Sequence, residues 1–95
     1  MTKTEQTVEK AIFAVRDERA KHRSGSGTVG TPSQLEWMEM QLVSMLDDLH
    51  QGRFSKERIG LGHIVADSWP LGHELSELVC AAEHAYERAA TRASA

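Results

Sequence analysis

The sequence is short of several residue types, and each shortage excludes a class of structure. Its 95 residues include one cysteine, Cys80, so no disulfide can form within the chain. No apolar run approaches the ~20 residues that a membrane-spanning helix needs, so we expect no membrane partner. The N-terminal stretch MTKTEQTVEK is charged and lacks the apolar core of a signal peptide. We therefore expect a cytoplasmic protein.

Positive charge is also scarce. The chain has 11 Lys and Arg against 14 Asp and Glu, which gives a formal net charge of -3. This leaves no excess of cations to neutralise phosphates, so we expect no nucleic-acid partner. Hydrophobic residues make up 40% and charged residues 26%, which is ordinary for a globular protein. The length allows one domain, residues 1–95.

Apolar residues recur at helical spacing in four segments, and no segment alternates as a half-buried strand does. In the first, Thr2 and Glu5 have the spacing of a capping box, and Val8, Ile12 and Val15 form one apolar stripe. This helix ends in the basic cluster 19–23, which suits the negative end of a helix dipole.

The glycine- and serine-rich stretch SGSGTVG, residues 24–30, is typical of a flexible linker. A second helix then begins, with Thr31 as the N-cap, Pro32 as its first residue and Gln34 completing a second capping box. Gly52 ends it. Its core seam alternates by three and four positions and consists of Leu35, Met38, Leu42, Met45 and Leu49.

Two further helices follow. Ser55 caps a short third helix that ends near Asp67, since Pro70 disfavours helical geometry in the residue before it. The fourth helix runs from about Leu71 to Arg92. The predicted fold is therefore all-α, a small antiparallel bundle of about four helices with a flexible linker after the first.

Two glycines interrupt the predicted third helix, and each costs about 1 kcal/mol relative to alanine there. Gly62 shares a face with Ile59 and Ala66, which favours close approach of another backbone. Gly60 lies on a different face, without an equivalent reason.

The histidines do not have the spacing of a metal site. His63 pairs with Asp67 and His73 with Glu77 at i, i+4, while His84 lies further along. Such pairs are common on charged helices, whereas a metal needs three or four converging ligands. We expect no metal and no cofactor.

Catalytic side chains also lack support. Cys80 has apolar neighbours and no adjacent base, which predicts a buried, unreactive thiol. No serine, lysine or carboxylate pair has the spacing of a nucleophile and its base, so we do not expect an enzyme.

The second helix has a polar face that includes an aromatic residue. Trp37, Gln41 and Ser44 lie about 100° from the core seam, and tryptophan often anchors protein interfaces. Trp37 and Trp69 are therefore candidate exposed anchors. The open alternatives are that Trp37 packs against the first helix and that Trp69 packs against Val65. Acidic neighbours would steer a basic partner. The predicted partner-binding residues are Glu36, Trp37, Gln41, Ser44, Asp47, Asp48, His63 and Trp69.

Several sequence elements also occur together in one group of proteins. In order, they are Gln41-Leu42, Arg53, Leu61-Gly62 with Ile64 and Ala66, Glu74-Leu75, Leu78, Ala82 and Tyr86. With these elements, the chain from Gln34 to about Tyr86 resembles small α-helical immunity proteins of bacterial type VI secretion, namely those that neutralise NAD(P)+ glycohydrolase toxins. The Gly-Ser linker, Gly60 and the Ser68-Trp69-Pro70 break depart from their pattern.

The resemblance implies a cytoplasmic, non-enzymatic inhibitor that binds a cognate toxin domain and blocks its active site. Related scaffolds imply other toxin chemistries as alternatives, such as nucleotide pyrophosphokinases or ADP-ribosyltransferases. For such an inhibitor, a homodimer in the absence of toxin is an open alternative. Two further alternatives for the function are a dimeric helical regulator or adaptor and a metal-dependent helical enzyme.

Overall fold

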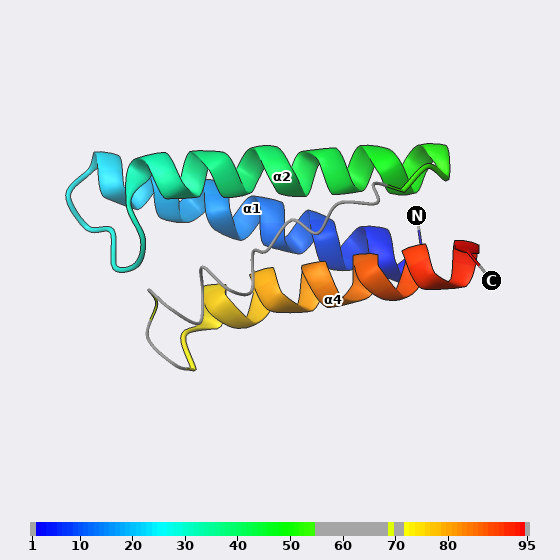
Figure 1. Ribbon diagram of the computed structural model, residues 1–95. Coiled ribbons are helices and arrows are strands. Elements are labelled where there is room, and N and C mark those ends of the chain that lie inside the picture. Colours follow the sequence, from blue (N-terminus) through cyan, green and yellow to red (C-terminus); the bar gives the residue numbers. More distant parts are fainter. Residues whose placement is uncertain (1, 55–68, 70–71, 95) are drawn as a thin grey trace.

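The computed structural model describes residues 2–54, 69 and 72–94, which form three helices (Figure 1). They are α1 (Lys3–Arg23), α2 (Pro32–Gln51) and α4 (Glu74–Ser94). Within these residues there is no strand, so the prediction of an all-α fold is confirmed. The predicted third helix at 55–67, with Gly60 and Gly62, lies outside the described residues. The predicted count of about four helices is therefore not confirmed.

Helix α1 begins with the predicted capping box. The Thr2 hydroxyl accepts a hydrogen bond from the Glu5 backbone N–H at 3.1 Å, and the Glu5 carboxylate accepts one from the Thr2 N–H at 3.2 Å. These bonds satisfy amides that have no partner within the helix. At the other end, Lys21, His22 and Arg23 occupy the last turn, where the helix dipole favours positive charge.

The boundaries of α2 agree with the sequence, but its capping box is incomplete. Thr31 caps the helix by accepting from the Gln34 N–H at 3.1 Å, and Gly52 ends it in a left-handed conformation with φ of 70°. The reciprocal bond predicted for the Gln34 side chain is absent among the described contacts. Instead, its Oε1 accepts from the Trp69 indole N–H at 2.9 Å. The Gln34 side chain thus accepts from a buried indole N–H that needs an acceptor, and not from the N-cap backbone N–H.

Helix α1 lies between the other two helices. Figure 1 shows α2 and α4 running in the same direction, opposite to α1, and α1 packs against both. Helix α4 begins at Glu74, later than the predicted Leu71. No helix among the described residues has the length and apolar character that crossing a membrane requires. The fully buried residues include Val8 and Val15 from α1, Leu35, Met38 and Leu42 from α2, and Val79 and Ala82 from α4.

The connection between α1 and α2 makes contacts that its glycine- and serine-rich composition did not predict. Val29 is only 4% exposed and belongs to the core. The buried carboxylate of Glu18 accepts hydrogen bonds from two consecutive backbone N–H groups, those of Thr28 at 2.6 Å and Val29 at 3.2 Å. A side chain of the preceding helix thus satisfies the backbone at the end of this connection, which glycine and serine content cannot reveal.

The loop contacts also change the acidity of Glu18. Burial by itself raises the pKa of this carboxyl group, but the hydrogen bonds from Thr28 and Val29 outweigh it. The pKa of Glu18 therefore lies below its ordinary value of 4.5. A carboxylate with a lowered pKa stabilises the fold above its unfolded pKa, and this stabilisation is lost as the pH falls through the folded pKa.

We therefore predict that Glu18→Gln destabilises the protein by about 1–3 kcal/mol at neutral pH, because a neutral amide replaces a charged acceptor of two N–H groups. Its free energy of unfolding should also fall less steeply below pH 4.5. Urea denaturation between pH 3 and 7 measures both effects. The matched control is Asp17→Asn, since Asp17 is an exposed neighbour that contacts only Lys21 in the described structure. Equal curves for the two variants would contradict the role given to Glu18.

A second prediction concerns the contact between the loop and Trp69. Gly30 has φ of 69°, and a Cβ there would lie 3.0 Å from the Gln34 Oε1 and 3.3 Å from the Trp69 ring. Gly25 has φ of 83° with nothing within 4 Å. Both alanine variants should lose about 1–2 kcal/mol for the left-handed backbone. Gly30→Ala should lose more, because its methyl group displaces the indole. Thermal melts compare the two, and equal losses would show that the loop does not contact Trp69 tightly.

Candidate protein-binding surface

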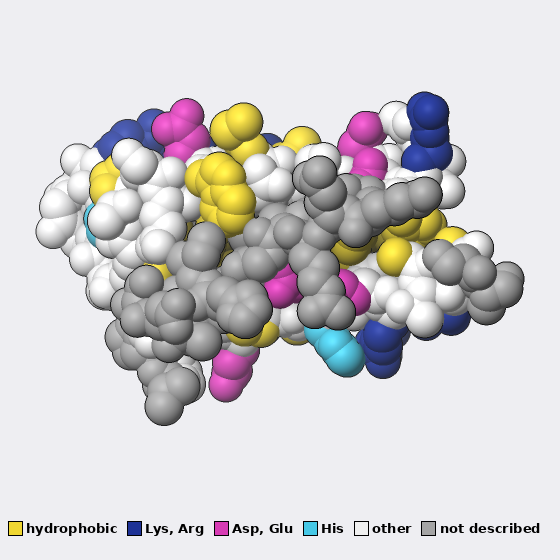
Figure 2. Space-filling model, viewed as in Figure 1, with side chains coloured by type: hydrophobic (Ala, Val, Ile, Leu, Met, Phe, Trp, Pro, Cys, Tyr) yellow, Lys and Arg dark blue, Asp and Glu magenta, His cyan; other side chains and the backbone are white. Residues whose placement is uncertain are grey.

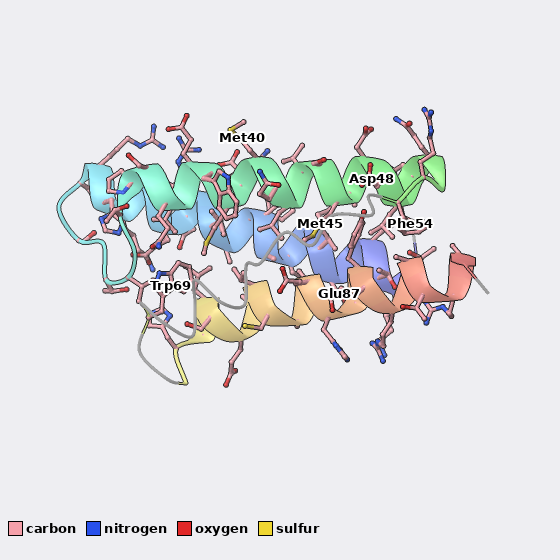
Figure 3. The ribbon with its side chains drawn as sticks, viewed as in Figure 1. Met40, Met45, Asp48, Phe54, Trp69 and Glu87 are labelled. Atoms are coloured by element: carbon pink, nitrogen blue, oxygen red, sulfur yellow. The ribbon has the colours of Figure 1, made fainter. Side chains whose placement is uncertain are left out.

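The outward side of α2 carries large apolar side chains. The core seam of α2 faces α1, and on the opposite side Glu36, Met40, Val43 and Asp47 follow one another at spacings of four, three and four. We call these four residues the outer stripe. Met40 is 62% exposed and Val43 43% exposed. In Figure 3, Met40 points away from the other two helices, whereas Met45 points toward them.

The outer stripe has apolar residues in its middle and an acid at each end. Figure 2 shows hydrophobic side chains protruding along the upper edge of the molecule, over α2, with acidic side chains on either side. Trp37 lies beside the stripe and is 37% exposed. Exposure is therefore the alternative that agrees with the structure, although more than half of the Trp37 side chain is covered.

An open hollow runs between α1 and the outer stripe. Its volume is about 570 Å³, and it is lined by Arg16, Glu39, Met40, Val43, Ser44 and Asp47. On the α1 side, the Arg16 Nε donates to the Glu39 Oε2 at 3.0 Å, and the Arg19 guanidinium bonds the other Glu39 oxygen. Burial raises the pKa of Glu39, but these two arginines outweigh it and hold that pKa below its ordinary value. Glu39 therefore stays ionised and fastens α2 to α1.

The structure separates the predicted partner-binding residues into several groups. Glu36, Trp37, Ser44 and Asp47 are exposed, and Gln41 is half-buried on the same helix. His63 lies outside the described residues.

Two predicted residues contact the protein itself. Asp48 accepts a hydrogen bond from the Tyr86 hydroxyl at 2.7 Å, so its carboxylate links α2 to α4. Trp69 is 5% exposed and belongs to the core, so it is not an exposed anchor, and core packing is the alternative that holds; Val65 lies outside the described residues. The physical reason is that its indole N–H finds an acceptor in Gln34, which allows the ring to be buried.

Met40 and Val43 were missed by the sequence reading, which searched for polar and aromatic residues on this helix. A signal was present, because both lie on the side of the helical wheel opposite the core seam. Phe13 of α1, which is 57% exposed, was missed in the same way.

Cys80 and the histidines are the remaining reactive side chains that the sequence analysis considered. Cys80 is exposed, so its prediction as a buried residue is wrong. Partial burial of its sulfur and the nearby Glu83 carboxylate raise the pKa of its thiol. The His73 Nδ1 accepts from the Leu75 N–H at 3.1 Å, at the start of α4. Among the residues that the structure describes, no three His, Cys, Asp or Glu side chains are placed to hold a metal ion.

Comparison with known proteins gave no match, since no protein family, curated protein or solved structure proved similar to the chain.

The different surroundings of Asp47 and Asp48 lead to a prediction. Asp48→Ala should destabilise the fold by about 1–2 kcal/mol, because the Tyr86 hydroxyl loses a charged acceptor. Asp47→Ala should stay within about 0.5 kcal/mol of the parent protein, since Asp47 accepts only from the exposed Gln51 amide among the described residues. Both changes remove one charge from the same end of α2, so dipole effects cancel in the comparison. Chemical denaturation measures the difference, and equal stabilities would show that Asp48 has no structural role.

Proposed function

We propose that this chain is a helical protein-binding protein that contacts its partner through the outward side of α2. The observation that carries the proposal is the exposure of Trp37, Met40 and Val43 on one helix, within a surface that also contains acids. Exposed apolar side chains that gather in one place, with polar residues around them, mark contact surfaces. Methionine and tryptophan are also favoured there, because one adapts its shape and the other buries a large rigid area.

The resemblance noted in the sequence refines the partner. In this proposal the chain is an immunity protein, acts in the cytoplasm, and blocks the active site of a cognate toxin domain, an NAD(P)+ glycohydrolase of type VI secretion. Glu36 and Asp47 would pair with the basic residues of a pocket that binds a phosphate-bearing substrate. Toxins of other chemistry are the alternative partners. No residue of this chain is assigned a catalytic role.

The positions that carry the resemblance support the scaffold in particular. Leu42 of α2 and Leu75, Ala82 and Tyr86 of α4 are all buried, and all four belong to the core. In this proposal the core residues maintain a helical scaffold common to the group, and the exposed side of α2 determines which partner binds.

A dimeric regulator is the second candidate, because an exposed apolar surface also serves contact between two copies. Sedimentation of the isolated protein distinguishes the two, since a toxin inhibitor need not self-associate while a regulator of this kind must.

The proposal predicts that the neighbouring reading frame encodes an NAD(P)+ glycohydrolase domain, and it is tested by co-expressing the chain with that domain. We expect the two proteins to co-purify and NAD+ hydrolysis by the toxin domain to stop. Met40→Asp should weaken the complex at least about tenfold, because it places a charge in the middle of the apolar contact. The matched control is Phe13→Asp, which changes an equally exposed apolar residue that does not line the hollow.

The outcomes separate the parts of the proposal. A complex that forms without loss of NAD+ hydrolysis would retain protein binding and contradict the toxin chemistry. Equal weakening by Met40→Asp and Phe13→Asp would contradict the assignment of the surface to α2. Thermal melts of both variants check that the fold is intact.

A further inference from the structure

The spacing of the outer stripe is that of a coiled-coil seam. Residues Glu36, Met40, Val43 and Asp47 are separated by four, three and four positions, which keeps them on one line of the helix. Its two acids lie on the order of 16 Å apart along the axis, at 1.5 Å per residue. Helix α2 therefore has two seams, an apolar one buried against α1 and an outer one with an apolar middle and acidic ends.

The acids of the outer stripe have no cationic partner among the described residues. In the described part of the chain, Glu36 has no hydrogen-bond or ion-pair partner, and Asp47 accepts only from the neutral Gln51 amide at 3.1 Å. Glu39 differs, because Arg16 and Arg19 share its carboxylate on the α1 side of the hollow. That cluster keeps one positive charge beside the stripe, while the stripe itself carries two negative charges and no positive one.

These charges disfavour a second copy of this chain as the occupant. If two outer stripes pack in parallel, Glu36 meets Glu36 and Asp47 meets Asp47 of the other copy. If they pack antiparallel with Met40 on Val43, then Glu36 of each copy meets Asp47 of the other. Both arrangements place acid against acid at both ends, and like charges at such flanking positions oppose pairing.

We infer that the outer stripe binds one helix of a different protein, and that this helix has apolar side chains in its middle and a Lys or Arg at each end. A helix matches the seam spacing, the apolar residues cover Met40 and Val43, and the cations pair with Glu36 and Asp47. The inference rests on the proposed function only in that the outward side of α2 is a binding surface. It does not require that the partner be a toxin.

The test uses three synthetic helical peptides of about 18 residues that share one leucine seam. The two positions that would face Glu36 and Asp47 are Lys in the first peptide, Gln in the second and Glu in the third. Fluorescence anisotropy of labelled peptide measures binding to the full chain. The Lys peptide should bind about tenfold more tightly than the Glu peptide at low salt, with the Gln peptide between them. Added salt should narrow the difference.

A charge reversal provides the matched comparison. The double variant Glu36→Lys with Asp47→Lys should reverse the order, so that the Glu peptide binds most tightly. Asp17→Lys with Glu87→Lys makes the same change in net charge at exposed positions on α1 and α4, and it should leave the order unchanged.

The results separate this inference from the proposed toxin. Equal binding of the three peptides, or an order that both double variants reverse, overturns the inference even if a toxin domain co-purifies. The expected order supports it even if no toxin domain binds, in which case the toxin proposal fails alone. A dimer that sediments from the isolated protein and disappears in Met40→Asp shows that a second copy occupies the stripe, and this also overturns the inference.

Discussion

The bonds from the loop backbone to the buried carboxylate of Glu18 determine where α2 begins. They hold Thr28 and Val29 against α1, with the Val29 side chain in the core. Only two residues later, Thr31 caps α2, so little freedom remains in the direction in which that helix starts. A loop of glycine and serine would otherwise allow many directions, and fixing it costs conformational entropy that a charged acceptor of two N–H groups helps to offset.

Once α2 is placed, its two sides have different roles. Its core seam faces α1, and the Glu39 carboxylate, which is shared by Arg16 and Arg19, adds an ion-pair link between the two helices. The Tyr86–Asp48 hydrogen bond adds a link to α4. Since a helix cannot bury opposite sides against the same neighbour, Met40 and Val43 must face outward. Their exposure is thus a consequence of the packing that stabilises the fold.

Local sequence signals predicted the helices well, because caps and apolar periodicity act within a few residues. Thr2, Thr31 and Gly52 each lie where their chemistry predicts. The errors concern long-range partners. Val29 could be placed in the core only by knowing that Glu18 accepts from its backbone N–H. Trp69 could be placed there only by knowing that Gln34 accepts from its indole N–H. The sequence predicted a binding surface on α2 from its polar and aromatic residues, and it did not single out Met40 and Val43, which the structure shows to be exposed on the same helix.

The number of acids on α2 overstates the negative charge that is available to a partner. Four acids lie between positions 36 and 48, and by count alone the helix is a strong attractor of cations. Glu39 is neutralised from α1 and Asp48 is occupied by Tyr86, so two acids remain available, one at each end of the outer stripe. General acidity would attract any basic surface, whereas two separated charges with apolar residues between them favour a partner of matching length and spacing. Selectivity on this surface therefore arises from which carboxylates the fold leaves unpaired.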